Sequence, residues 1–313
     1  MTEKSTGSYE VIVVGGGAAG LSAALVLGRA RRRTLVVDAG EPRNAPAAHM
    51  QGYLSRDGMS PADFLAVGRE EIARYGVELV RDRAVDVEGG QEFTVALESG
   101  RTARARRLVV ATGLKDELPD VPGVAEHFGR DVLHCPYCHG WEVRDRAFGV
   151  LATTPMSVHQ ALMVTQWSKD VTFFLHKVAE SDLPDDDVRR LAAAGVKVVP
   201  GEVAGLVTED DRLTGVRLAD GTEHGREVLF VAPRAVPQTG LLEKLGAEFQ
   251  ETPFGSYPVV DPTGLTSVPG VWAAGNAMGF SEQVVNAAAG GYRAGAFING
   301  ELLMTDLDAV APA

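Results

Sequence analysis

The sequence is poor in cysteine and has no excess of basic charge. Cys135 and Cys138 are its only cysteines, and no second C-x-x-C is present to complete a four-ligand structural zinc site. Asp and Glu outnumber Lys and Arg by 42 to 30, which gives a net charge of -12 and an isoelectric point near 5.1. This balance argues against nucleic acid and anionic membranes as partners. Repeats and low-complexity linkers are also absent.

The stretch that comes nearest to a long apolar run is interrupted by glycine. Residues 11–28 are uncharged and long enough for a membrane span, but four glycines crowd into a turn there and the basic run 29–33 follows. We therefore expect no membrane span. Residues 1–8 contain no apolar core, so we expect no signal peptide and a cytoplasmic protein. In that compartment a C-x-x-C pair is usually catalytic rather than structural.

The same stretch has the pattern of a nucleotide-binding turn. Residues 11–14 are apolar and β-branched, which is typical of a buried parallel strand. They lead into GGGAAG at residues 15–20, and residues 21–29 have a helical pattern. In this G-x-G-x-x-G arrangement Gly15 permits the tight turn, Gly17 lets a pyrophosphate approach the backbone, and Gly20 lets helix and strand pack closely. The N-terminus of the helix favours the phosphates.

A second strand follows at the spacing of a dinucleotide-binding unit. Residues 34–37, Thr-Leu-Val-Val, have the pattern of a strand and end at Asp38, which lies 18 positions after Gly20. An acid there is placed to accept hydrogen bonds from both ribose hydroxyls of an adenosine. With 313 residues, 45% hydrophobic and 23% charged, the chain is long enough for two domains with full-sized cores.

Both cysteines lie in the heptapeptide His134-Cys135-Pro136-Tyr137-Cys138-His139-Gly140. Two thiols at this spacing can cycle between dithiol and disulfide, and a histidine beside them can carry protons. A Cys2His2 zinc site would have to take its histidines from the same heptapeptide, and inert buried cysteines are the third alternative. Of the three, the pattern favours redox chemistry, and we expect no bound metal.

Two further segments are typical of a flavin site. Residues 108–110 form an apolar strand that ends in Ala111-Thr112-Gly113, where small residues let the backbone pass near a cofactor. A strand at 268–273 runs into Ala274-Gly275-Asn276, and residues 282–291 open a helix rich in small residues. A helix N-terminus aimed at the N1 and O2 edge of a flavin would stabilise the charge of the reduced ring. In this order, the segments favour an FAD enzyme over a nicotinamide dehydrogenase.

With these marks the chain resembles the low-molecular-weight thioredoxin reductase family from end to end. The matching motifs are GGGAAG at 15–20, ATG at 111–113, CPYC at 135–138 and VWAAGN at 271–276. The resemblance implies an α/β fold made of two dinucleotide-binding, Rossmann-like domains. Each would have three layers in the order β-sheet, β-sheet, α-helices (ββα).

The same resemblance implies how the domains are arranged along the chain. The FAD-binding domain would be split between residues 1–116 and 237–313. A smaller lobe of the NADPH-domain type, at residues 117–236, would carry the C-x-x-C. Members of the family are homodimers, so a homodimer is also expected.

The inserted lobe departs from the reductase pattern at its nucleotide loop. Residues 148–152 are predicted to form the strand that leads to the NADPH phosphates, but the chain then reads Thr153-Thr154-Pro155-Met156-Ser157 rather than G-x-G-x-x-A. Side chains there occupy the space that a pyrophosphate needs. His176-Lys177 is only a remnant of the basic triplet that binds the 2′-phosphate in the reductases. We therefore predict that the protein does not use NADPH productively.

CPYCHG combined with a broken nucleotide loop also resembles a narrower group, the dithiol oxidases that close the disulfides of gliotoxin, holomycin and related natural products. His139 stands where the reductases carry an aspartate, and Asn276 replaces another of their aspartates. The resemblance implies an FAD-dependent oxidation of a small-molecule dithiol, with O2 reduced to H2O2. Two alternatives remain open: a disulfide reductase that draws electrons from NADPH, ferredoxin or another donor, and a non-catalytic flavin-binding module.

The resemblance gives each cysteine a role, with Cys138 nearest the flavin and Cys135 facing the substrate. Only a thiolate attacks a disulfide, so a base is needed, and a histidine titrates in the right range. His139 is our first choice for that base and His134 the second, while either ring could simply pack the loop.

The motifs and the resemblance together predict the residues that contact FAD. They are Gly15, Gly17, Ala18, Ala19, Gly20, Asp38, Ala39, Arg43, Asn44, Gln51, Val85, Ala111, Thr112, Gly113, Gly275, Asn276, Gln283 and Val284.

Overall fold

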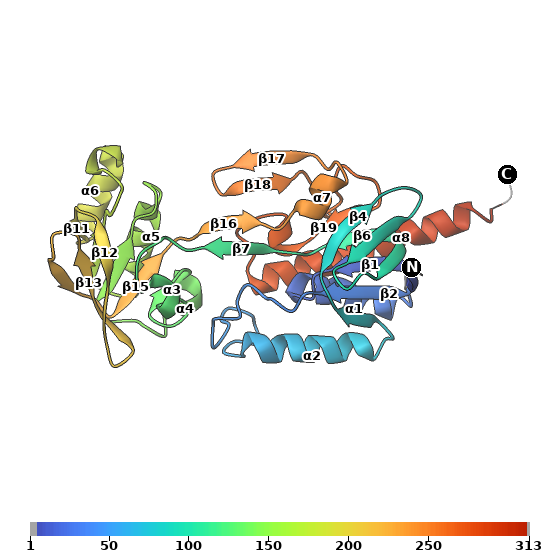
Figure 1. Cartoon of the computed structure of the whole chain (residues 1–313), viewed down its shortest axis with the longest axis horizontal. Helices are drawn as coiled ribbons and strands as arrows, with labels where there is room; N and C mark the ends of the chain where they lie inside the picture. Colours follow the sequence, from blue (N-terminus) through green and yellow to red (C-terminus); the bar gives the residue numbers. More distant parts are fainter. Residues whose placement is uncertain (1–4, 312–313) are drawn as a thin grey trace. The chain divides into compact units, whose positions relative to one another are not determined.

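The computed structural model describes residues 5–311, which form two compact units (Figure 1). The first unit runs up to Ala45, from Ser60 to Lys115, and onwards from Ala235. The second unit comprises Pro46–Met59 and Asp116–Arg234. The chain thus crosses after residue 115 and returns after residue 234, where the sequence predicted 116 and 236. The grouping of Pro46–Met59 with the second unit was not predicted.

The first unit is built on a seven-stranded sheet of order β3-β2-β1-β6-β5-β4, with β19 also paired to β6. Strands β3, β2, β1, β6 and β19 are parallel, whereas β4 and β5 are antiparallel to their neighbours. The strands are β1 (Ser5–Val14), β2 (Thr34–Asp38), β3 (Glu78–Arg81), β4 (Ala84–Glu88), β5 (Phe93–Leu97), β6 (Thr102–Val110) and β19 (Val271–Ala273). A separate hairpin is formed by β17 (Phe249–Thr252) and β18 (Gly255–Pro258).

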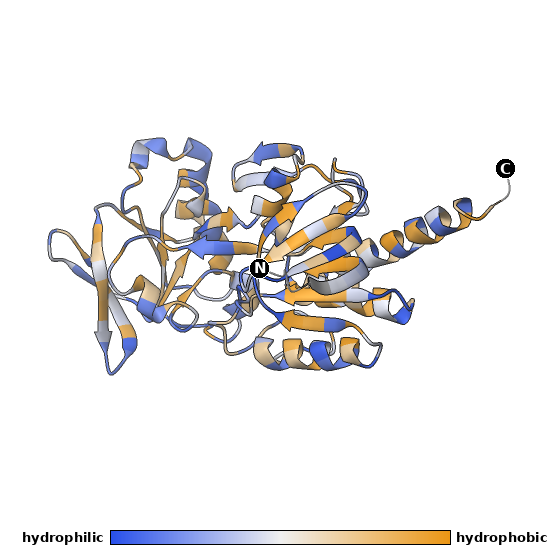
Figure 2. Ribbon diagram, turned by 45° about the vertical axis from the view of Figure 1, so that its right-hand side comes forward, coloured by the Kyte–Doolittle hydropathy of each residue, from blue (hydrophilic) through white to orange (hydrophobic). Residues whose placement is uncertain are grey.

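Alternate residues of β1 serve two hydrophobic cores. Val11 and Val13 pack with α1, α2 and α8 on one face of the sheet, and Ile12 and Val14 pack with β5, β19 and α7 on the other. This follows from the two-residue period of a strand that is covered on both faces. The helices are α1 (Ala18–Arg29), α2 (Pro61–Ala73), α7 (Gly240–Lys244) and α8 (Val284–Asp308), with a 3-10 turn η2 (Gly275–Ala277). Figure 2 shows the apolar strands of this sheet in orange.

The second unit has a five-stranded parallel sheet of order β11-β10-β9-β15-β8 and a three-stranded antiparallel sheet of β12, β13 and β14. Its strands are β8 (Val132–Leu133), β9 (Phe148–Leu151), β10 (Val171–Phe174), β11 (Lys197–Val199), β12 (Val203–Glu209), β13 (Arg212–Leu218), β14 (Glu223–Gly225) and β15 (Val228–Val231). Its helices are α3 (Val124–His127), α4 (Pro136–His139), α5 (Ser157–Val164) and α6 (Asp185–Ala193), with a 3-10 turn η1 (Glu180–Asp182). Paired strands β7 (Leu114–Glu117) and β16 (Arg234–Pro237) carry the chain between the units.

Strand β15 shows the layering of the second unit. Val228 and Phe230 pack with α5 and α6 on one face, while Leu229 and Val231 pack with β12 and β13 on the other. The parallel sheet therefore lies between a helical layer and an antiparallel sheet, which is the ββα arrangement predicted from the sequence. None of the helices between residues 5 and 311 is both long enough and apolar enough to cross a membrane. The apolar stretch 11–28 is divided between β1, a turn and α1.

Candidate functional site

The GGGAAG turn joins β1 to α1 and leaves room for a ligand at one point only. Gly15 has φ +109°, and a Cβ atom added there would lie 2.2 Å from the Ala111 carbonyl oxygen. A Cβ at Gly20 would lie 1.8 Å from the Gly15 carbonyl oxygen, whereas a Cβ at Gly17 would meet nothing within 4 Å. No side chain caps the N-terminus of α1. The turn therefore fits the pyrophosphate of a dinucleotide, which needs open space above uncapped backbone amides.

Asp38 ends β2 beside this turn and is mostly buried. Its Oδ1 accepts hydrogen bonds from the amides of Gly16 at 3.2 Å and Gly40 at 3.1 Å. Its Oδ2 forms an ion pair with Arg81, which ends β3 directly opposite in the sheet register. The carboxylate is therefore held in place, as a ribose-binding acid must be. The motifs gave no sign of Arg81, because the pairing of β2 with β3 cannot be read from local spacing.

The other predicted flavin segments reach the same edge of the sheet. Strands β1, β6 and β19 are adjacent and parallel, so the turns that follow them meet. The amide of Ala111 donates to the Val14 carbonyl at 2.8 Å, and a Cβ at Gly275 would lie 2.9 Å from the Cβ of Ala19. Gly113, at φ +71°, has open space where a Cβ would stand. The structure thus brings the GGGAAG, ATG and AAGN motifs together at one edge of the sheet.

Asn276 holds the loop that leads into α8. Its Nδ2 donates to the carbonyl oxygens of Gly279 at 3.0 Å and Phe280 at 3.1 Å, which leaves only Oδ1 as an acceptor. Helix α8 then begins at Val284, with Gln283 as its N-cap residue. The small residues of α8 have a packing role, since a Cβ at Gly291 would lie 1.9 Å from the Ala19 carbonyl oxygen of α1.

The remaining predicted FAD contacts lie outside the turns that follow β1, β6 and β19. Arg43 and Asn44 follow the GGGAAG unit in a short turn closed by Ala45 N to Pro42 O at 3.0 Å. Gln51 lies in the segment that groups with the second unit. Val85 is exposed, and its carbonyl accepts a hydrogen bond from Lys244 at 3.2 Å. Their cofactor contacts, and that of Ala39, stay predictions.

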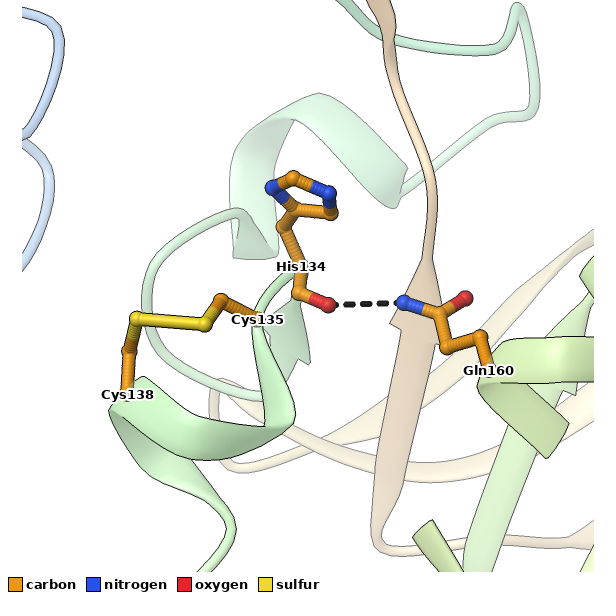
Figure 3. Close-up of a disulfide and its surroundings, with 4 residues drawn as sticks. All are labelled: His134, Cys135, Cys138 and Gln160. Carbon is orange, nitrogen blue, oxygen red and sulfur yellow. Dashed lines mark hydrogen bonds between the residues drawn. A yellow bond between two sulfur atoms is a disulfide. The ribbon is translucent and has the colours of Figure 1, made fainter. Parts of the chain in front are cut away.

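The redox pair lies where β8 gives way to α4. Cys135 is the N-cap residue of α4, Pro136 occupies the first helical position, and Cys138 follows one turn later. A disulfide joins Cys135 to Cys138, with their Cα atoms 5.2 Å apart (Figure 3). Both cysteines are half-buried, so the bridge is partly accessible. Among residues 5–311, no group of three His, Cys, Asp or Glu side chains is arranged to hold a metal ion.

His139 ends α4 and carries the features of a base. Burial lowers the pKa of His139 below its usual value, against the opposing effects of the Cys135 backbone and Glu142. A lowered pKa keeps the imidazole neutral at pH 7, so it can accept a proton. Its Nδ1 is buried and has no hydrogen-bond partner of normal geometry within residues 5–311.

His134, which directly precedes Cys135, is hydrogen-bonded to Gln160 through its backbone. Figure 3 shows the His134 imidazole pointing away from the disulfide, while its carbonyl oxygen accepts a hydrogen bond from Gln160 Nε2 at 2.7 Å. Gln160 is buried and comes from α5, so this helix fixes the backbone just before Cys135. Sequence reasoning missed Gln160, because a lone glutamine in an apolar helix belongs to no motif.

In the loop after β9, where the reductases bind NADPH, a side chain of the loop itself occupies the backbone amides. Ser157 is buried at the start of α5, and its Oγ accepts hydrogen bonds from the amides of Thr153 at 3.1 Å and Thr154 at 3.3 Å. These are the backbone amides that a phosphate would use in a G-x-G-x-x-A loop. At the end of β10, His176 Nδ1 accepts from the Val203 amide at 3.0 Å. The groups expected to hold NADPH therefore bind other parts of the same unit.

Known proteins match this chain over nearly its full length. The family model described as pyridine nucleotide-disulphide oxidoreductase matches residues 9–291. The thioredoxin reductase sirT of Leptosphaeria maculans is 33% identical, with 96% of each chain covered. The thioredoxin reductase tcpT of Claviceps purpurea is also 33% identical, with 94% of each chain covered.

Solved structures also match over nearly the full length of the chain. The crystal structure of HlmI has a TM-score of 0.91 and 51% identity, covering 96% of this chain and 95% of that one. An oxidoreductase from Agrobacterium tumefaciens has a TM-score of 0.89 and 40% identity, covering 95% and 99%. The fold class that the family resemblance implied is confirmed. The chain belongs to the pyridine nucleotide-disulphide oxidoreductase family, is thioredoxin reductase-like, and is an oxidoreductase.

Proposed function

We propose that this protein is an FAD-dependent dithiol oxidase that closes an intramolecular disulfide in a small-molecule dithiol. The balanced reaction is R(SH)2 + O2 → RS2 + H2O2. The observation that carries the proposal is the filled second nucleotide loop, in which Ser157 takes both amides that a nicotinamide nucleotide would need. With a redox disulfide and a filled nucleotide loop, we propose that electrons enter through sulfur and not from NADPH. The resemblance to the gliotoxin and holomycin dithiol oxidases points the same way.

The first unit supplies the residues for FAD. The turn at 15–20 would hold the pyrophosphate, Asp38 the ribose, and the segments at 111–113 and 275–284 the flavin ring. When bound, FAD supplies the two-electron acceptor that restores the Cys135–Cys138 disulfide and passes the electrons to O2.

The second unit supplies the thiol chemistry. A substrate thiolate attacks Sγ of Cys135, which forms a mixed disulfide and releases Cys138 as a thiolate. The second substrate thiol loses its proton and displaces Cys135, so the product leaves with its disulfide closed. His139 accepts the proton, because a free thiol of pKa about 8.5 is only a few per cent ionised at neutral pH.

Steady-state turnover of a small dithiol under air tests this function. We expect one O2 consumed and one H2O2 formed for each disulfide produced, with no effect of added NADPH. Cys135→Ser and Cys138→Ser should each abolish turnover while FAD stays bound. Undiminished turnover in either variant would show that the C-x-x-C is not the reactive pair.

The names of the curated relatives favour a second candidate, a disulfide reductase that draws electrons from NADPH or another donor. Such an enzyme would have to displace Ser157 from the Thr153 and Thr154 amides before a pyrophosphate could bind there. A reductase fed by another donor, such as ferredoxin, would not meet this obstacle.

We also propose that the protein is a homodimer, as the family resemblance implies. In both views the C-terminal half of α8 projects beyond the sheet of its own unit (Figures 1 and 2). Leu303, Met304 and Leu307 on this half are 49%, 58% and 49% exposed. Their spacing places them on one side of the helix, so a second copy of the chain could bury them together.

A further inference from the structure

The first cysteine of the redox pair lies between two regular elements. Strand β8 ends at Leu133, and α4 begins at Pro136. His134 and Cys135 connect them, and the pairing of β8 with β15 spans only two residue pairs. Connecting segments of this kind are more mobile than the elements they join. Contacts from other elements therefore decide how firmly Cys135 is held.

One buried side chain of α5 makes such a contact. Gln160 Nε2 donates a hydrogen bond of 2.7 Å to the carbonyl oxygen of His134, in the peptide group that leads to Cys135 (Figure 3). Gln160 is only 9% exposed, and its neighbour Ala161 packs in the same core cluster as Leu133. Side chains in a packed core have little freedom to move. The donor is therefore held at a fixed place relative to the end of β8.

We propose that Gln160 is a positioning residue for the redox pair, and that it keeps Cys135 in place for closure after the disulfide has been reduced. In the oxidised protein the Cys135–Cys138 bond joins the two residues whether or not Gln160 is present. In the dithiol this covalent link is gone, and the hydrogen bond to His134 restricts the backbone just before Cys135. The inference rests on the proposed function only in taking this pair as the reactive one.

A hydrogen bond that acts mainly on the dithiol changes the equilibrium between dithiol and disulfide. Closing the disulfide orders the backbone around Cys135, which costs conformational entropy. Gln160 orders part of this backbone in advance, so the two thiols meet at a higher effective concentration. Without the bond the dithiol gains freedom that the disulfide lacks, and closure becomes less favourable. A bond that only stabilised the fold would stabilise both forms equally and leave this equilibrium unchanged.

Glutathione measures the equilibrium without oxygen and without turnover. The exchange is protein disulfide + 2 GSH ⇌ protein dithiol + GSSG, where GSH and GSSG are reduced and oxidised glutathione. The FAD-loaded protein is equilibrated without oxygen in mixtures of GSH and GSSG, its thiols are alkylated, and mass spectrometry counts the labels. The flavin absorbance is recorded alongside, so that electrons held by FAD are counted separately.

Two variants remove the hydrogen bond by different routes. Gln160→Met keeps the length of the side chain but has no donor, and Gln160→Asn keeps the amide but is one methylene shorter. Gln160→Met also removes the buried Oε1, which has no hydrogen-bond partner among residues 5–311, so we expect this variant to fold. Denaturant titration of the oxidised proteins checks the fold. Gln166→Met, at an exposed glutamine just after α5, is the matched control.

We expect both Gln160 variants to shift the equilibrium constant toward the dithiol by roughly tenfold, because the backbone of about one residue is set free. A tenfold shift raises the midpoint potential of the pair by about 30 mV. Gln166→Met should keep the wild-type constant.

An unchanged constant in either Gln160 variant would overturn the inference, since both variants lose the bond. A shift toward the disulfide would do the same. So would an equal shift in Gln166→Met, because that change does not touch the contact with His134. If the wild-type protein oxidises no small dithiol under air, the proposed function fails, and the glutathione constants still decide the role of Gln160.

Discussion

Among single residues, His139 is the proposed base. Its ring is largely buried, and it directly follows Cys138 in α4. Because burial lowers its pKa, the base form exists at neutral pH and is lost only as the pH falls through that lowered value. We expect wild-type kcat/KM to fall on the acid side as His139 becomes protonated. His139→Asn should lower kcat/KM by about 100-fold and remove this acid limb. His159→Asn, at an exposed histidine of α5, is the control for the pH profile. An acid limb that persists in His139→Asn would rule out this ring as the base.

The hydrogen bonds of Ser157 lead to a prediction about the free energy of unfolding and not about the reaction rate. Its hydroxyl is the acceptor for two partly buried amides, so Ser157→Ala leaves both without that partner. We expect the free energy of unfolding to drop by about 1–3 kcal/mol, measured by denaturant titration. Ser181→Ala, at an exposed serine, should change it by less than about 0.5 kcal/mol. Equal values for the two variants would mean that Ser157 does not close the loop.

The sequence patterns indicated the candidate site residues that lie in motifs, but not the residues that hold them in place. Cys135, Cys138 and Asp38 belong to motifs whose spacing is local, and the structure places Asp38 at the end of β2 and joins the two cysteines in a disulfide at α4. Gln160 and Arg81 act on partners 26 and 43 positions away. Contacts of that kind depend on which strands and helices become neighbours, which no local pattern encodes.

Among the elements, the loop before α8 depends on Asn276. An aspartate has no N–H to give to the Gly279 and Phe280 carbonyls and would repel them. We expect Asn276→Asp to loosen this loop and to weaken FAD binding by about tenfold, since two hydrogen bonds contribute roughly 0.5–1.5 kcal/mol each. Kd for FAD added back to the apoprotein measures this. Asn299→Asp, which keeps an acceptor for Arg32, is the control. Equal FAD affinity in both variants would argue against the role of Asn276.

Strands and helices with clear periodicity were predicted well. Residues 11–14, 35–37, 108–110 and 148–151 are apolar and all lie in strands, because burial on both faces demands such residues. The strand predicted at 268–273 begins only at Val271, because the Pro269-Gly270 turn precedes it. The segment Pro46–Met59 was different. It has little regular structure, and its grouping with the second unit arises from tertiary contacts that its composition does not signal.

For the complete chain, the exposed end of α8 leads to a prediction about assembly. Leu303→Glu combined with Leu307→Glu places two charges on the face proposed for the second copy. Burying unpaired carboxylates is costly, so we expect sedimentation to show a dimer for the wild type and a monomer for the double variant. Thr305→Glu on the same exposed turn is a charge control. A double variant that sediments like the wild type would exclude this face.

The direction of electron flow distinguishes an oxidase from a reductase more sharply than any single variant. It can be followed by titrating the FAD-loaded protein without oxygen, with a small dithiol or with NADPH, while recording the visible absorbance of the flavin. We predict that the dithiol bleaches the flavin in proportion to the amount added, that NADPH leaves it yellow, and that air restores the colour with release of H2O2. Bleaching by NADPH faster than by the dithiol would contradict the proposed direction of electron flow.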